Sequence, residues 1–120
     1  MDVTRFSLTD APPATPSQLF DMTGRVVIIT GGSRGLGLGL AEGYAAAGAK
    51  VVVASRDKES CANAAALLRR QGGEALGMAC DLADLTQISA LVQHTVEHLG
   101  AIDVVVNNAA APRSLPRAAR

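Results

Sequence analysis

Four short, mostly apolar segments recur along the chain, and a helical pattern follows each of the first three. The first, Val26–Thr30, is a continuous run of β-branched residues, as expected for a strand that is buried on both faces of a parallel sheet. The predicted strands are Val26–Thr30, Lys50–Ser55, Glu74–Cys80 and Ile102–Asn107. The predicted helices are Leu36–Ala47, Asp57 to about Gln71 and Asp84 to about Leu99; aspartates cap the last two, and glycines follow all three.

This alternation of strand and helix predicts an α/β fold, a Rossmann-type doubly wound parallel sheet. Right-handed crossovers would place the strands in the order 3-2-1-4, with the sheet truncated after the fourth strand. That strand would then be an exposed apolar edge. We therefore expect marginal stability, and self-association through the fourth strand unless a partner covers it.

The segments on either side of this pattern have a different composition. Residues 1–24 contain Pro12, Pro13 and Pro16 without sustained periodicity, which predicts an N-terminal arm before a half-domain at residues 25–108. Residues 109–120 hold three arginines, two prolines and no acid, which predicts an irregular tail. The abrupt change at Ala109 suggests a truncated or alternatively terminated chain with an out-of-frame end.

Composition and charge narrow the function classes. The formal net charge is zero and aromatic residues make up 2% of the chain, so we expect no nucleic-acid partner. The internal apolar runs are far shorter than a membrane span, and no apolar leader follows Met1, so we expect no membrane partner and no secretion. Cys61 and Cys80 have no metal-ligand spacing and are interpreted as free thiols, which predicts the cytoplasm.

The chemistry-bearing motif is the glycine-rich turn Gly31–Gly37, which lies between a predicted strand and the start of a helix. Unpaired backbone N–H groups and the helix dipole make that position attractive to a pyrophosphate, and glycines allow it to approach closely. A tight turn without any ligand is the alternative. The complete strand–helix–strand context favours dinucleotide binding.

With Thr30 before it, this turn has the spacing TGxxxGxG and resembles the signature of the short-chain dehydrogenase/reductase family. Three later segments match that family in order and spacing: Ala54-Ser55-Arg56, Asp81-Leu82 and Asn107-Asn108-Ala109. The resemblance covers residues from about 22 to 109. It implies that the second segment lies against the adenine ring and that the third supports the sheet beside the cofactor.

One position departs from the family pattern. Ala110 replaces the glycine of the family's NNAG motif, so we expect the loop after the fourth strand to leave its usual path.

Cofactor choice depends on the residues after the second strand. Asp57 is placed where an acid could bind the ribose of NAD(H), but Ser55 stands where NAD-preferring members of the family carry that acid. Arg56, with Arg34 in the turn, could hold a 2′-phosphate, and Asp57 is better explained as a helix cap. The sequence favours NADP(H), with NAD(H) as the alternative.

The resemblance also implies hydride transfer between a nicotinamide and a carbonyl or alcohol, with a YxxxK motif and a serine handling the proton. Tyr44, on the first helix beside the nucleotide, is the only tyrosine, and Gly48 stands four residues later. The chain is therefore expected to be inactive alone. It is either a piece of a reductase, whose substrate belongs to the longer parent, or a non-catalytic dinucleotide-binding or interaction module.

One histidine pair could suggest a metal site. His94 and His98 are one helical turn apart but lie away from the apolar stripe of Leu85, Ile88, Val92, Val96 and Leu99, and no third ligand is near. No catalytic residue and no metal ligand is predicted. The predicted cofactor-binding residues are Gly31, Gly32, Ser33, Arg34, Gly35, Leu36, Gly37, Ser55, Arg56, Asp81, Leu82, Asn108 and Ala109.

Overall fold

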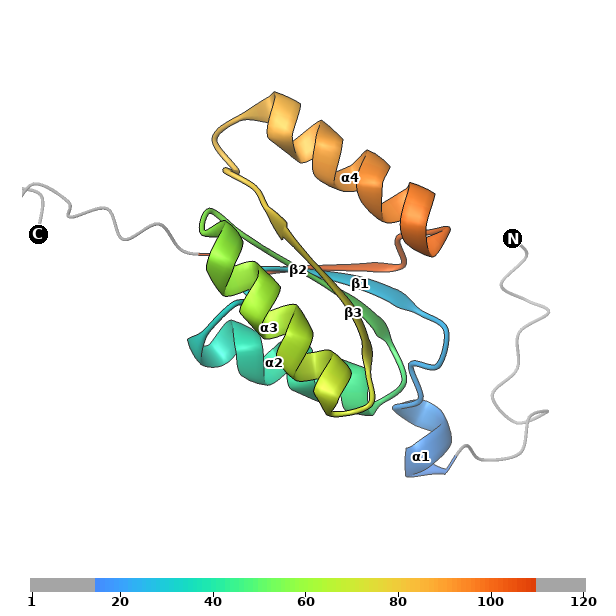
Figure 1. Cartoon of the computed structure of the whole chain (residues 1–120). Coiled ribbons are helices and arrows are strands. Elements are labelled where there is room, and N and C mark those ends of the chain that lie inside the picture. Colours follow the sequence, from blue (N-terminus) through green and yellow to red (C-terminus); the bar gives the residue numbers. More distant parts are fainter. Residues whose placement is uncertain (1–14, 110–120) are drawn as a thin grey trace, which may run out of the picture.

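The computed structural model describes residues 15–109, so the predictions made for residues 1–14, for Ala110 and for the rest of the tail lie outside the described residues. Four strands and four helices follow one another within the described residues (Figure 1). The strands are β1 (Val26–Thr30), β2 (Lys50–Ser55), β3 (Glu74–Ala79) and β4 (Val104–Asn107). The helices are α1 (Pro16–Leu19), α2 (Gly35–Ala46), α3 (Lys58–Arg70) and α4 (Leu85–Leu99).

The strands form one parallel sheet in the order β3-β2-β1-β4, which confirms the predicted α/β class and topology. The first two strands begin and end where the sequence predicts, because β1 is a continuous β-branched run that ends before Gly31 and β2 is centred on Val51–Val53. β4 is shorter than predicted and begins at Val104. Its place at the edge of the sheet is confirmed.

Helices cover the two faces of this sheet unequally. On one face α2 and α3 enclose a core that includes Val27, Val53 and Leu68. On the other face α4 lies alone over a smaller core that includes Ile28, Val52 and Leu91. Figure 1 shows α4 on one side of the sheet and the other two long helices on the opposite side.

The face that α4 turns toward the sheet differs from the predicted apolar stripe. The buried positions of the helix are Leu91 and Thr95, whereas Leu85, Val92 and Val96 are exposed. Apolar residues cover a wide arc of this helix, so their periodicity alone does not select the face that meets the sheet. The prediction of the stripe was therefore wrong at these three exposed positions.

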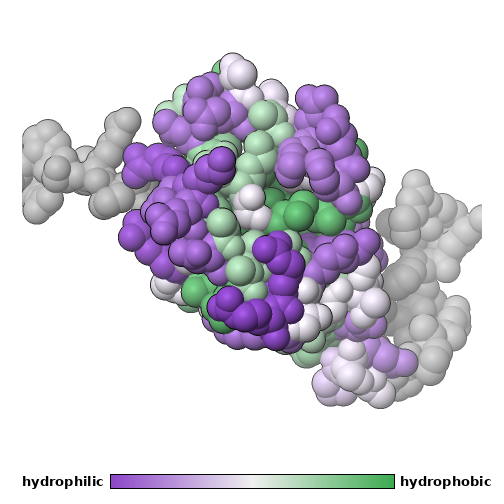
Figure 2. All heavy atoms as spheres, viewed as in Figure 1, coloured by the Kyte–Doolittle hydropathy of each residue, from purple (hydrophilic) through white to green (hydrophobic). Residues whose placement is uncertain are grey.

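Apolar atoms also reach the surface along β3, the other edge strand. Figure 2 shows them as a band between the polar outer surfaces of α4 and α3, where β3 crosses in Figure 1. Leu76 and Met78 of this strand are partly buried and pack against the α4 core. Both edges of the sheet thus leave apolar surface that the described residues do not fully cover.

The short helix α1 lies inside the segment predicted as an N-terminal arm. Thr15 caps it in a capping box with Gln18, and Pro16 occupies its first turn. Four residues are too few to show helical periodicity, so only these end signals could have revealed it. Beyond α1, the backbone N–H of Met22 donates to the carbonyl of Ala47, which ties this segment to the end of α2.

Candidate functional site

The glycine-rich turn connects β1 to α2 at the carboxyl edge of the sheet. Gly31 has a φ of +68°, which L side chains rarely adopt, and its N–H donates to the carbonyl of Ala54 on β2. A Cβ at this position would lie 3.0 Å from the Cα of Ala109. Glycine therefore lets three strand ends meet in a small space.

Gly37 allows the first turn of α2 to approach that turn. A Cβ there would collide with the Gly31 carbonyl oxygen and with the Asn108 side-chain amide. The Asn108 amide donates to the same carbonyl over 3.3 Å. Gly37 thus lets the helix approach both the turn itself and the residue that follows β4.

The first turn of α2 presents backbone donors at this edge. Arg34 occupies the N-cap in an extended conformation, and its side chain makes no capping hydrogen bond. The first bond back into this turn runs from the Leu38 N–H to the Arg34 carbonyl. In the described part of the chain the N–H groups of residues 35–37 have no such partner, so a helix end with partial positive charge faces outward.

Hydrogen bonds of the Thr30 side chain link the ends of β1 and β4 next to the turn. The buried Thr30 hydroxyl accepts from the N–H groups of Asn108 and Ala109, each at 3.1 Å, and donates to the Val106 carbonyl. The sequence places Thr30 in the TGxxxGxG pattern but gives no sign of these long-range bonds. They hold Asn108 where it reaches Gly31.

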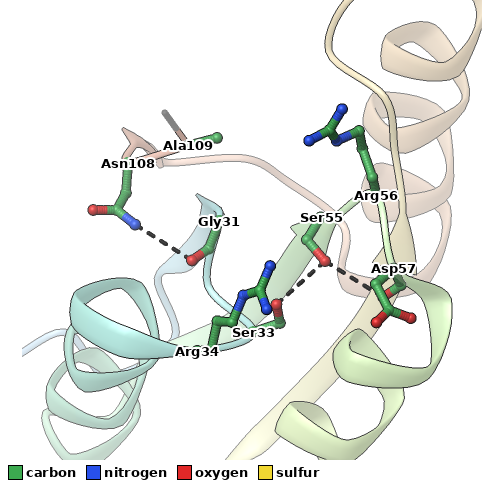
Figure 3. Close-up of a pocket in the computed structure, with 8 residues that line it drawn as sticks. All are labelled: Gly31, Ser33, Arg34, Ser55, Arg56, Asp57, Asn108 and Ala109. Atoms are coloured by element: carbon green, nitrogen blue, oxygen red, sulfur yellow. Dashed lines mark hydrogen bonds between the residues drawn. The ribbon is translucent and has the colours of Figure 1, made fainter. Parts of the chain in front are cut away.

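A cleft of about 540 Å³ opens beside these groups (Figure 3). Seven of the predicted cofactor residues line it, together with Asp57. The lining residues are Gly31, Ser33, Arg34, Ser55, Arg56, Asp57, Asn108 and Ala109.

The other six predicted cofactor residues do not line the cleft. Gly32 and Gly37 are buried, Gly35 and Leu36 are exposed in the first turn of α2, and Asp81 and Leu82 follow β3. The Asp81 carboxylate accepts from the Ala83 N–H within its own turn. The roles predicted for these six residues stay predictions.

Two arginines approach the cleft from different elements. Arg34 comes from the glycine-rich turn and Arg56 from the end of β2, with Ser33 and Ser55 between them (Figure 3). Neither arginine forms a salt bridge with another of the described residues. Both guanidinium groups are therefore available to an anion at the mouth of the cleft.

Asp57 caps α3, as the sequence predicts. One carboxylate oxygen accepts from the N–H groups of Glu59 and Ser60, and the other accepts from the Ser60 hydroxyl at 2.7 Å. These bonds, the one from the Ser60 hydroxyl first, hold the pKa of Asp57 below its ordinary value, and the charge of Arg34 adds to the effect. The acid is thus engaged with its own helix.

Tyr44 does not lie beside this cleft. Its side chain packs against the α2–α3 core and lines a separate apolar pocket between α1 and α2, with Phe20 and Met22 on the other side. Tyr44 therefore lies on the helix that begins at the glycine-rich turn, but it is not among the residues that line the cleft.

The histidine pair on α4 contacts its own helix. The His98 ring nitrogen Nδ1 lies 2.8 Å from the His94 carbonyl oxygen. Residues 15–109 contain no group of three or more potential metal ligands. Over the same residues, no helix combines the length and apolar character that a membrane crossing requires.

Known proteins resemble this chain in both amino-acid sequence and fold. The family profile described as short chain dehydrogenase matches residues 25–119. The chain is 43% identical over 89 residues to galactitol 2-dehydrogenase of Agrobacterium fabrum, covering 74% of this chain and 34% of that protein. It is 39% identical over 98 residues to a fatty acyl-CoA reductase of Acinetobacter baylyi, covering 82% of this chain and 32% of that enzyme.

Solved structures of dehydrogenases and oxidoreductases also match the fold of this chain. A hydroxysteroid dehydrogenase from Escherichia coli matches with a TM-score of 0.75 and 32% identity, over 82% of this chain and 44% of that one. A metagenomic short-chain oxidoreductase in complex with NADP matches with a TM-score of 0.70 and 37% identity, over 74% and 40%. The chain spans about a third of the length of the curated relatives. It belongs to the short-chain dehydrogenase/reductase family.

Proposed function

We propose that this chain binds NADP(H) in the cleft between the glycine-rich turn and the end of β2. The observation that carries the proposal is the pair Arg34 and Arg56, which line the cleft and form no salt bridge with another of the described residues. NAD(H) is the alternative cofactor. The pyrophosphate would lie at the first turn of α2, and the adenosine 2′-phosphate would lie between the two guanidinium groups.

The pyrophosphate part of this proposal is supported by the backbone. Among the described residues, the N–H groups of Gly35, Leu36 and Gly37 have no hydrogen-bond partner, and they lie at a helix N-terminus, where the dipole favours an anion. Gly31 and Gly37 leave no side chain between this helix end and the turn. Glycines at these two positions therefore leave room for a phosphate to reach the backbone N–H groups of the helix end.

The preference for the 2′-phosphate is supported by the residues at the end of β2. Ser55 offers a neutral hydroxyl there, and the neighbouring Asp57 carboxylate is already used in capping α3. A carboxylate free to bind a ribose hydroxyl would repel a phosphate, whereas a guanidinium can bind one with two hydrogen bonds. The solved relative in complex with NADP agrees with this choice.

Family membership makes an oxidoreductase the parent activity, with a carbonyl or alcohol as the substrate class. Tyr44 is the only tyrosine and is followed four residues later by Gly48, so these 120 residues contain no YxxxK motif. We propose that the chain as given binds the cofactor without catalysing hydride transfer. Incubation with NADPH and a panel of carbonyl compounds tests this, and cofactor oxidation by the chain alone would contradict it.

The test of the binding proposal is calorimetric titration of the 120-residue chain with NADPH and with NADH. We expect NADPH to bind more tightly, and Arg56→Ala to weaken NADPH binding about tenfold or more, since a charge-assisted hydrogen bond contributes roughly 1.5–3 kcal/mol. NADH binding should change little. Arg70→Ala, on the exposed end of α3 far along the helix from the cleft, is the matched control. Equal affinities for the two cofactors would overturn the preference.

An interaction module is the second candidate, and the exposed edge strand favours it. Val105 of β4 is 51% exposed on the face that α4 covers only in part. We propose that a second copy of the chain associates through this strand.

We also assign the chain to the cytoplasm, because Cys61 and Cys80 are both free thiols, as is usual in a reducing compartment.

A further inference from the structure

A chain of hydroxyl and thiol groups lies beneath the two arginines of the cleft. The Ser55 hydroxyl oxygen lies 3.3 Å from the Ser33 hydroxyl, 3.4 Å from the Asp57 carbonyl oxygen and 3.0 Å from the Cys61 sulfur. The Cys61 thiol also lies 3.8 Å from the Ser55 carbonyl oxygen. Ser55 is therefore held from the cleft side by Ser33 and from the protein interior by Cys61.

These contacts use the full bonding capacity of one hydroxyl. A serine hydroxyl has one proton to donate and two lone pairs that accept. In the arrangement where Ser55 donates to the Asp57 carbonyl, one lone pair accepts from the Ser33 hydroxyl, and the other faces the Cys61 thiol, whose single proton is shared between the Ser55 hydroxyl and the Ser55 carbonyl. The thiol is the one partner of Ser55 in this set that has no contact with the cleft.

The position of Cys61 depends on a close approach between α3 and β3. A Cβ at Gly77 would collide with the Cys61 carbonyl, so glycine allows the first turns of α3 to lie directly on the strand. Cys61 is completely buried there. An apolar side chain would fill the same space without supplying a donor to Ser55.

We infer that Cys61 is a positioning residue for the 2′-phosphate end of the cleft, an inference that rests on the proposed NADP(H) binding. When a 2′-phosphate is present, the Ser33 hydroxyl turns toward it and leaves Ser55. The Cys61 thiol then keeps one Ser55 lone pair bonded and holds the serine in place beside Arg56. With NADH the Ser33 hydroxyl stays on Ser55, and the thiol makes no difference to binding.

The experiment measures dissociation constants for NADPH and NADH on the full 120-residue chain and its variants. Cys61→Ala should weaken NADPH binding about three- to tenfold, the range of one hydrogen bond, and change NADH binding by less than about twofold. Cys61→Ser should restore NADPH binding. In a Ser55→Ala background, Cys61→Ala should cause no further change in the ratio of the two constants.

Cys80→Ala is the matched control, because Cys80 is similarly buried but its side chain packs in the α4 core. It should lower the melting temperature without changing the NADPH-to-NADH ratio. If Cys61→Ala does not fold, Cys61→Val, which fills the space but lacks the donor, replaces it.

Two results would overturn the inference. Equal weakening of both cofactors by Cys61→Ala, or an unchanged ratio in a folded variant, would show that the thiol has only a packing role. Failure of the wild-type chain to bind NADPH would instead overturn the proposed function, and this inference with it. The wild-type titration therefore separates the two failures.

Discussion

Two runs of three valines flank the same strand of the sheet and have different surroundings. Val52 of β2 and Val105 of β4 both pair with Ile28 of β1 and lie on the same face, yet Val52 is completely buried and Val105 is 51% exposed. The difference comes from their neighbours. β2 lies between two strands under α4, whereas β4 is an edge strand and its Val105 is not part of the α4 core.

This contrast shows how each strand is held in place. β2 is stabilised by burial on both faces. β4 has less burial, and polar bonds at its two ends fix it: Thr30 and Gly31 bind the Asn108 end, and the Asp103 carboxylate accepts from the Val26 N–H at 2.8 Å. The cleft lies at the carboxyl ends of both strands, so its shape depends on the well-packed strand and on the anchored one.

We expect the largest effect from a substitution that disrupts the hydrogen bond between Asn108, which follows β4, and Gly31. Gly37→Ala places a methyl group against the Gly31 carbonyl and the Asn108 amide, and backbone cannot move aside as easily as a flexible side chain. We expect a loss of roughly 2 kcal/mol or more in unfolding free energy and loss of detectable cofactor binding. Urea unfolding and titration with NADPH measure the two effects.

Gly39→Ala on the same helix is the control. A Cβ at Gly39 has open space around it, so alanine should leave stability unchanged or raise it by about 0.5–1 kcal/mol. If both substitutions had the same effect, the close approach at Gly37 would not be the cause.

The next prediction measures the contrast between the valines directly. Val52→Ala removes two buried methyl groups and should reduce the unfolding free energy by roughly 2 kcal/mol, whereas Val105→Ala should change it by less than about 0.5 kcal/mol. Both values come from urea unfolding at matched protein concentration. Equal losses would mean that Val105 is covered in solution.

A third prediction tests whether a second copy of the chain covers Val105 of β4 in solution. If a second copy lies on β4, Val105→Lys should shift the chain toward monomer in sedimentation velocity and leave its far-UV circular dichroism unchanged. Glu59→Lys, on the exposed first turn of α3, introduces the same side chain at another surface position and is the control. A wild-type chain that sediments as a monomer at every concentration would rule out self-association through this strand.

The smallest effect is a pH dependence of the helices that flank the sheet. Hydrogen bonds in the caps, from the Ser60 side chain to Asp57 and from the Gln87 side chain to Asp84 in particular, lower the pKa of both carboxyl groups. Because the folded pKa values lie below the unfolded ones, this stabilisation is present above about pH 4 and is lost as pH falls through the folded values. Asp57→Asn and Asp84→Asn should each flatten the acid side of a stability profile, and an unchanged profile would contradict the assignment.

Much of the fold could be predicted because its signals are local. The β-branched runs of β1 and β2 end at residues that interrupt them, and Asp57 and Asp84 stand at helix starts. The strand order followed from the handedness of crossovers.

The rest depends on contacts between distant segments. The face of α4 that meets the sheet is set by packing, and the Thr30 hydroxyl joins residues 78 and 79 positions away. The Cys61–Ser55 contact requires α3 to lie on Gly77. None of these can be obtained from periodicity or spacing, which is why the sequence predicted most of the cleft residues but not the bonds that hold them.

Amide NMR of the chain titrated with NADP tests the central claim most directly. Binding at the proposed site should cause saturable shifts in the N–H signals of Gly35, Leu36 and Gly37 and in that of Arg56, with the signals of α4 unchanged. Absence of saturable shifts, or shifts confined to α4, would contradict the claim that this cleft is a dinucleotide site.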